Sequence, residues 1–305
     1  MRRRFPFKTL LFIILLAGFF YVWKRPPFEY GATTPYMEAY TPVPQAQAQD
    51  AERGGAEEKP PAFALEFNVP LSVGEINDTR ALELVNLEYA INDEPMAGLI
   101  VSAWPDVPVS SKEVTIHSAA LEAVREMFAA AREANDGTYY VASGYRNRDR
   151  QALVYNDAAD KSFVQPPGHS EHQTGLAADI FIIGIGQNDM ALSREGRWLA
   201  ENSWKYGLIL RYPEGKRAVT GIGYEPWHFR YVGQPHAQYC RENNLCFEEY
   251  IQFLKDGGGY SAELDGKTYH VLYQIPSDGI IYVPEGSDYS VSGDNTGGYI
   301  ITAWE

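Results

Sequence analysis

The chain has 305 residues, enough for two ordinary domains, and its 45% hydrophobic and 22% charged residues are typical of globular proteins. It carries 26 Lys and Arg against 40 Asp and Glu, and this acidic excess argues against binding to a phosphate backbone. Its two cysteines cannot form a disulfide framework or a thiolate zinc finger.

Residues 1–23 predict a basic cytoplasmic end followed by a transmembrane helix. Arg2, Arg3, Arg4 and Lys8 precede an apolar run from Thr9 to Trp23. The basic residues before the run predict a cytoplasmic N-terminus and a body outside the cell. The alternative is a cleaved signal peptide, but Arg25 to Glu29 follow the run in place of a small-residue cleavage site. We therefore expect an uncleaved, single-pass anchor.

Residues 24–62 are rich in Pro, Ala, Gln and Glu, a composition that cannot bury enough apolar surface to fold. We expect a disordered linker here, followed by a domain over residues 63–256. Apolar patterns predict strands at 82–86, 139–143, 176–183, 208–212 and 227–232. A helix capped by Ser118 and ended by Asn135 to Gly137, and another capped by Ser193 and ended by Gly207, are predicted beside them. Because the elements do not alternate regularly, we expect an α+β fold, with a small mixed or antiparallel sheet and flanking helices.

Residues 257–305 differ from the preceding domain in their pattern of short alternating runs and turns, and they begin with three glycines. Short alternating runs at 269–273, 280–283 and 298–302 are separated by turn residues such as Asp265-Gly266 and Asp294-Asn295. The pattern predicts a small β-rich appendage with no evident chemistry of its own.

A single charge, Asp179, interrupts the apolar run at 176–183, and a buried carboxylate is costly unless it is paired or binds a cation. His172 lies seven residues earlier, and Gly175 permits a tight turn between the two. Further along, Trp227, Phe229 and Tyr231 alternate onto one face of a predicted strand and leave His228 and Arg230 on the other. His172, Asp179 and His228 can therefore converge on one point.

Two imidazoles and one carboxylate provide three protein ligands for one zinc ion and leave a fourth position open, as in catalytic zinc sites. Glu225, three residues before His228, is placed to act as a general base without binding the metal. The alternative for each residue alone is ordinary, such as a buried hydrogen-bonded Asp or a core His. The set as a whole predicts a metal-dependent hydrolase.

The sequence resembles the VanY-type D-alanyl-D-alanine carboxypeptidases, a family of zinc peptidases. The resemblance covers roughly residues 82–250 and is carried by Ser143-Gly144-Tyr145-Arg146 with Gln151, by the segment from Ser170 to Asp179, by Leu208 to Pro213 with Lys216, and by Glu225 to Gly233. It implies His172, Asp179 and His228 as zinc ligands and Glu225 as the general base, and it places Arg146 near the substrate. A guanidinium suits either the developing oxyanion or the terminal carboxylate of the substrate, and the sequence leaves that choice open.

The resemblance implies removal of the terminal D-Ala from peptidoglycan stem peptides, with Gln151 and Ser170 as candidate substrate contacts. The first alternative is an L,D-carboxypeptidase or another peptidoglycan peptidase of the same fold, and the second is a non-catalytic zinc-containing cell-wall binding module. Two smaller points stay open. Arg230 is a candidate partner for a carboxylate behind the metal site, and Cys240 and Cys246 form a disulfide only if a helix ends between them.

Overall fold

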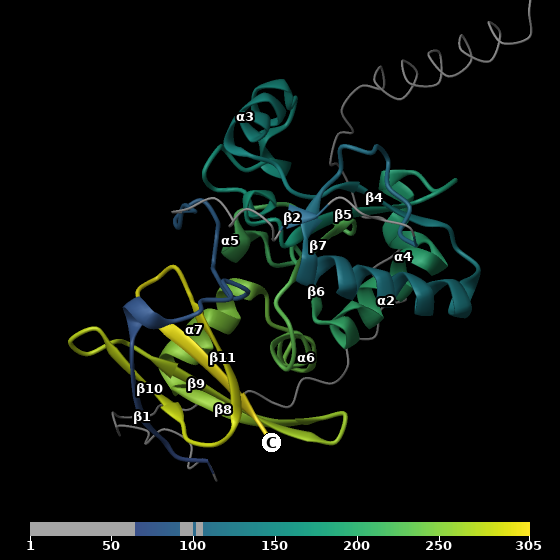
Figure 1. Ribbon diagram of the computed structural model, residues 1–305. Helices are drawn as coiled ribbons and strands as arrows, with labels where there is room; N and C mark the ends of the chain where they lie inside the picture. Colours follow the sequence, from purple (N-terminus) through teal and green to yellow (C-terminus); the bar gives the residue numbers. More distant parts are fainter. Residues whose placement is uncertain (1–64, 92–99, 102–105) are drawn as a thin grey trace, which may run out of the picture. The chain divides into compact units, whose positions relative to one another are not determined.

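The computed structural model describes residues 65–91, 100–101 and 106–305, coloured in Figure 1. The helices of these residues are α2 (Ser118–Asn135), α3 (Arg148–Asp157), α4 (Arg194–Asn202), α5 (Arg217–Thr220), α6 (His236–Glu242) and α7 (Phe247–Gly257). The strands are β1 (Phe67–Ser72), β2 (Ile100–Val101), β3 (Ile116–His117), β4 (Tyr139–Ser143), β5 (Ala177–Ile182), β6 (Leu208–Leu210), β7 (His228–Tyr231), β8 (Gly259–Leu264), β9 (Lys267–Gln274), β10 (Ile280–Pro284), β11 (Asp288–Gly293) and β12 (Tyr299–Trp304). Helices and strands are mixed as predicted, and the C-terminal strands are present.

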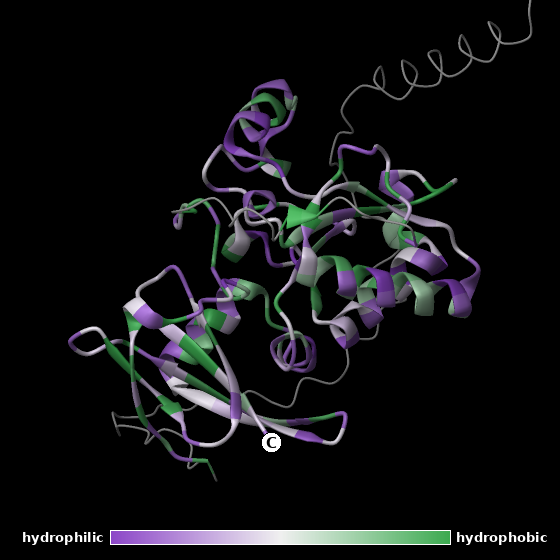
Figure 2. Cartoon of the chain, viewed as in Figure 1, coloured by the Kyte–Doolittle hydropathy of each residue, from purple (hydrophilic) through white to green (hydrophobic). Residues whose placement is uncertain are grey.

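The first four-stranded sheet has the order β4-β5-β7-β6, with every neighbouring pair antiparallel. One face of this sheet is apolar and packs on α2 and α4 in a shared core. That core includes Val124 and Phe128 of α2, Leu199 of α4, Ile180 of β5 and Phe229 of β7. Hydrophobic and hydrophilic residues alternate around α2, as an amphipathic helix on a sheet requires (Figure 2). The other face of the sheet carries the polar side chains Asp179 of β5 and His228 and Arg230 of β7.

Two local predictions from the sequence are wrong. α2 is capped by His117, whose Nδ1 accepts from the backbone N–H of Ala119, and Ser118 is already helical. The segment 82–86 is not a strand, because its backbone finds irregular partners. The N–H of Leu82 donates to the Ser292 hydroxyl and that of Leu84 to the Asp294 carbonyl. The cap at Ser193 is confirmed, since its side chain accepts from the backbone of Gly196.

The second four-stranded sheet, with the order β11-β12-β9-β8, comes from residues 259–304, and β10 pairs with β1. The predicted Asp265-Gly266 turn joins β8 and β9, with φ of 52° and 76° as a type I′ turn requires. Val271 and Ile300 of this sheet share a buried core with helices α6 and α7. The C-terminal strands therefore pack on the helices that follow β7, and the division at residue 256 stays a prediction.

The predicted anchor over residues 1–23 and nearly all of the predicted linker over 24–62 lie outside the described residues. None of the helices that the structure describes combines the length and the apolar character needed to cross a membrane. Cys240 and Cys246 are both buried, and both are free thiols.

Candidate metal centre

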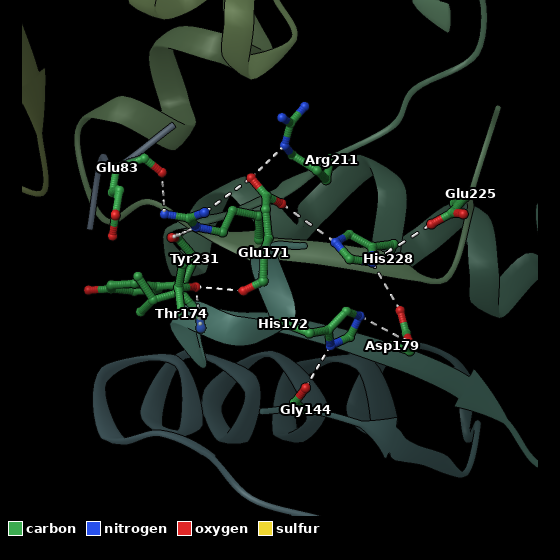
Figure 3. A network of polar contacts seen from close by, with 12 residues as sticks. Glu83, Gly144, Glu171, His172, Thr174, Asp179, Arg211, Glu225, His228 and Tyr231 are labelled. Atoms are coloured by element: carbon green, nitrogen blue, oxygen red, sulfur yellow. Dashed lines mark hydrogen bonds and ion pairs between the residues drawn. The ribbon is translucent and has the colours of Figure 1, made fainter. Parts of the chain in front are cut away.

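The predicted ligands His172, Asp179 and His228 come together on the polar face of the first sheet (Figure 3). Asp179 lies in β5 directly opposite His228 of β7 in the antiparallel register. His172 lies in a single 3-10 turn, Glu171–Thr174, which ends at Gly175 with φ of 74°, a conformation that favours glycine. One donor atom from each of the three side chains lies within 4.8 Å of the other two.

The hydrogen bonds of His172 decide which of its two ring nitrogens can bind a metal ion. Its Nδ1 lies 2.6 Å from the carbonyl oxygen of Gly144, and a carbonyl can only accept, so this nitrogen carries the proton. The lone pair is then on Nε2, which lies 3.2 Å from Oδ2 of Asp179. Burial, with a contribution from Arg146, lowers the pKa of His172 to about 4. The ring is therefore neutral at physiological pH, as a metal ligand must be.

Whereas His172 faces Asp179 with Nε2, His228 faces it with Nδ1. Its Nδ1 lies 3.0 Å from Oδ1 of Asp179, while its Nε2 lies 3.6 Å from Oε2 of Glu171. Burial opposes protonation of this ring, but Asp179 and Glu171 outweigh it and raise the pKa of His228 to about 9. Burial likewise raises the pKa of Asp179, yet the two histidines hold it well below its usual range.

This donor set fits zinc. Two imidazole nitrogens from buried histidines and one carboxylate oxygen from a half-buried aspartate face one small region, which is the ligand type and number of a catalytic zinc site. The negative charges that favour a proton on His228 would equally favour a divalent cation in its place. The donors also have ordered outer partners, Gly144 for His172 and Glu171 for His228, as metal-binding histidines usually do.

Glu225 lies beside the three donors but outside the set. One of its carboxylate oxygens is 3.7 Å from Nδ1 of His228, and the residue is 4% exposed. Burial raises the pKa of Glu225 to about 8, against the opposing influence of His228 and Arg146. A carboxylate in this position, with a pKa near neutrality, can accept a proton from a molecule held next to the donors.

Arg146 reaches the same carboxylate as the histidines. Its Nη2 donates to Oδ2 of Asp179 at 3.1 Å, its Nε to the Ser143 hydroxyl at 3.0 Å, and its Nη1 to Oε1 of Gln151 at 2.9 Å. Gln151 is fully buried and also donates to the carbonyl of Gln165. These hydrogen bonds of Gln151 hold Arg146 in place. Ser170 is buried at the start of the 3-10 turn, where its side chain makes no capping hydrogen bond.

A buried ion cluster behind the donors was not predicted as a unit. Glu171 accepts from Arg211 at 2.8 Å and from Arg230 at 3.0 Å, and all three side chains are fully buried. The expected carboxylate partner of Arg230 is therefore Glu171. The sequence does hold a signal for this cluster. Glu171 is a charged residue directly beside His172, and Arg211 and Arg230 lie within or next to apolar strands.

Comparison with known proteins agrees with this geometry. The family model described as VanY, D-alanyl-D-alanine carboxypeptidase, matches residues 113–234. The putative carboxypeptidase YodJ of Bacillus subtilis (strain 168) is 38% identical over 196 residues, which cover 59% of this chain and 70% of that protein. The chain belongs to the VanY family.

Two further relatives agree. A D-alanyl-D-alanine carboxypeptidase of Enterococcus faecium is 41% identical over 167 residues, and the chain spans 54% of the length of that relative. The crystal structure of the vancomycin resistance D,D-dipeptidase VanXYg, in complex with a D-Ala-D-Ala phosphinate analogue, superposes with a TM-score of 0.68 at 30% identity. That match covers 78% of this chain and 98% of the other. Every candidate site residue, from Arg146 to His228, lies within the VanY match. Among the described residues, His172, Asp179 and His228 form a group that could hold one metal ion, and their donor types fit zinc.

Proposed function

We propose that this VanY-family chain is a D-alanyl-D-alanine carboxypeptidase that removes the terminal D-Ala from peptidoglycan stem peptides. The observation that carries the proposal is the convergence of three zinc donors with Glu225 at 3.7 Å from one of them and Arg146 hydrogen-bonded to another. The relatives named above, which are carboxypeptidases and a D,D-dipeptidase, support the substrate class.

When bound at His172, Asp179 and His228, zinc supplies a Lewis acid that activates a water and polarises the scissile carbonyl. Glu225 takes the proton of the attacking water and then delivers it to the leaving amine of D-Ala. Its burial favours this role, since a pKa near neutrality lets one group act as base and then as acid. A divalent cation held beside Glu225 would favour the ionised form of this carboxylate, which is the form that accepts a proton.

Arg146 supplies a fixed positive charge beside the reacting carbonyl. Its contacts to Ser143, Gln151 and Asp179 hold the guanidinium in one orientation, so no reorganisation is required when negative charge develops. In this proposal Gln151 acts by positioning Arg146, and Ser170 lines the substrate side of His172. The choice between oxyanion and terminal carboxylate as the partner of Arg146 is part of the proposal to be tested by kinetics.

The proposal is tested by metal analysis of the purified protein together with D-Ala release from a muramyl pentapeptide. We expect one zinc per chain and release of one D-Ala per pentapeptide. Release of D-Ala from a tetrapeptide alone would assign the chain to the L,D-carboxypeptidases instead. Zinc binding without hydrolysis of either peptide would assign it to the non-catalytic cell-wall binding modules.

We also propose that residues 1–23 anchor the protein in the cell membrane and that residues 24–62 tether the catalytic part outside it. The proposal is supported by four basic residues preceding an apolar run of membrane-spanning character. Fractionation of cells that make the full chain tests it. We expect the protein in the membrane fraction, with protease added outside the cell degrading the catalytic part.

A further inference from the structure

Glu171, Arg211 and Arg230 form the buried ion cluster behind the metal donors. Charge balance alone does not require the way in which Glu171 divides its two oxygens between partners. Glu171 directs its two carboxylate oxygens to different partners. Oε1 accepts from Nε of Arg211 at 2.8 Å and from Nη1 of Arg230 at 3.0 Å. Oε2 faces Nε2 of His228 at 3.6 Å. Figure 3 shows Glu171 between Arg211 on one side and the ring of His228 on the other.

The two atoms that face each other are otherwise without partners. Oε2 of Glu171 and Nε2 of His228 are both buried, and neither has a hydrogen-bond partner within 3.5 Å among the residues that the structure describes. A buried polar atom without a partner destabilises the folded state, so these two atoms, 3.6 Å apart, are best understood as a polar contact in which the carboxylate is the acceptor. For a carboxylate as acceptor, the proton of His228 must then be on Nε2.

Both arginines have further hydrogen-bond partners that hold them against Glu171. Arg211 is held at its far side by Glu248, at 2.6 Å and 2.8 Å, and Arg230 by the backbone carbonyls of Ala81 and Glu83, at 3.0 Å and 3.1 Å. Two guanidiniums donate charge-assisted hydrogen bonds to the same oxygen, Oε1, and these stabilise the ionised form of Glu171. The residue is therefore a permanent carboxylate with one oxygen committed to cations and one facing His228.

We propose that Glu171 is a positioning residue for the metal centre, which fixes the proton of His228 on Nε2 and thereby leaves the Nδ1 lone pair for zinc. The inference rests on the proposed zinc site and concerns residues of this chain alone. His172 needs the opposite assignment, with its proton on Nδ1, and receives it from the Gly144 carbonyl. The two histidines are therefore held by different acceptors so that different nitrogens face Asp179.

Replacing Glu171 by Gln gives a sharp test, because a carboxamide cannot serve both sides. If the side-chain oxygen of the new Gln faces the two arginines, its NH2 group faces Nε2 of His228. Nε2 must then act as an acceptor, so the proton of His228 must move to Nδ1. If the amide is turned, its NH2 faces two guanidiniums, which have only donors. Either arrangement weakens the site although the volume of the side chain is unchanged.

Glu248→Gln is the matched control. It makes the same chemical change on a carboxylate that contacts the same Arg211 but not His228. Zinc affinity is measured by competition with a chelator, and folding by circular dichroism. We expect Glu171→Gln to weaken zinc binding 10- to 100-fold, the usual effect of losing an outer partner of a ligand, and Glu248→Gln to change it less than about threefold.

Zinc affinity of Glu171→Gln within threefold of the parent chain would overturn the inference, as would equal weakening in both variants, since charge balance would then suffice. If Glu171→Gln does not fold, nitrogen NMR of the histidine rings in the zinc-loaded parent chain decides the matter. We expect a proton on Nε2 of His228 and zinc at Nδ1, and zinc at Nε2 would overturn the inference. A parent chain that binds no zinc would instead refute the proposed function.

Discussion

Replacing Glu225 by Gln separates proton transfer from metal binding. The substitution keeps the size of the side chain but removes its ability to accept a proton. Glu225 is not among the three donors, and its nearer oxygen lies 3.7 Å from Nδ1 of His228. We therefore expect the variant to retain its zinc. Because burial already favours the neutral form of Glu225 in the metal-free chain, a neutral amide should not destabilise the fold.

The magnitude follows from the role. A positioned general base contributes about 10²- to 10⁴-fold in rate. At about 1.4 kcal/mol for each factor of ten, Glu225→Gln should raise the activation free energy by roughly 3 to 5 kcal/mol. The substrate contacts of Arg146 are untouched, so the loss should lie in kcat and leave KM nearly unchanged.

The assay is D-Ala release from a pentapeptide under saturating substrate, with zinc content measured on the same sample. Glu214→Gln, the same chemical change at an exposed glutamate, is the control and should keep parental kcat. A kcat within tenfold of the parent at full zinc content would refute the general-base role. Loss of zinc from Glu225→Gln would show instead that the carboxylate is a metal ligand.

Substitutions at three other positions test the roles of single side chains. Arg146→Lys keeps the charge but loses the hydrogen bonds to Ser143, Gln151 and Asp179. The value of kcat/KM should therefore fall about 10²- to 10³-fold at unchanged zinc content. A fall of less than tenfold would contradict a role of Arg146 in stabilising the transition state. Ile300→Ala leaves a cavity in the core that β12 shares with α6 and α7, so the free energy of unfolding should fall by about 2–5 kcal/mol. We expect the variant to unfold in a single transition. A separate transition for the C-terminal strands would show that they fold alone. Burial lowers the pKa of His236 to about 3, so below pH 6.5 the unfolded chain binds a proton that the folded chain does not. Stability should therefore decrease as the pH falls from 6.5 toward 3, by about 1.4 kcal/mol per pH unit for this group, and urea unfolding of His236→Gln should show a correspondingly weaker pH dependence.

Local signals were sufficient for much of the fold. The run at 139–143, the run at 176–183 and the cap at Ser193 each carry their information within a few residues, and the structure has β4, β5 and α4 there. The prediction of a strand at 82–86 failed because the backbone N–H groups of Leu82 and Leu84 bond to residues about 210 positions away, without a strand ladder. Periodicity reports that a residue is buried, and only the partners of its backbone decide whether it is in a strand.

The candidate metal donors were also predictable from the sequence, because zinc is bound by few residue types. An isolated Asp in an apolar strand and two histidines in turn-rich or aromatic contexts form the donor pattern of such a site, and the resemblance to the VanY family indicated the same residues. Roles that depend on neighbours were harder to assign. The sequence offered Gln151 as a substrate contact, which stays a prediction, and gave no sign that its side chain hydrogen-bonds to Arg146 and to the Gln165 carbonyl.

The sequence by itself determined the residue types of the candidate metal site, the amphipathic helices and the turns that need glycine, since each depends on side-chain chemistry or on backbone torsion within one short segment. Only the tertiary structure decided that Glu171 meets Arg211 and Arg230, which lie 40 and 59 residues further along, and that one of its oxygens is left for His228. Such a cluster exists because segments distant in the chain exclude water together, and a charge buried among them must find its partners in space.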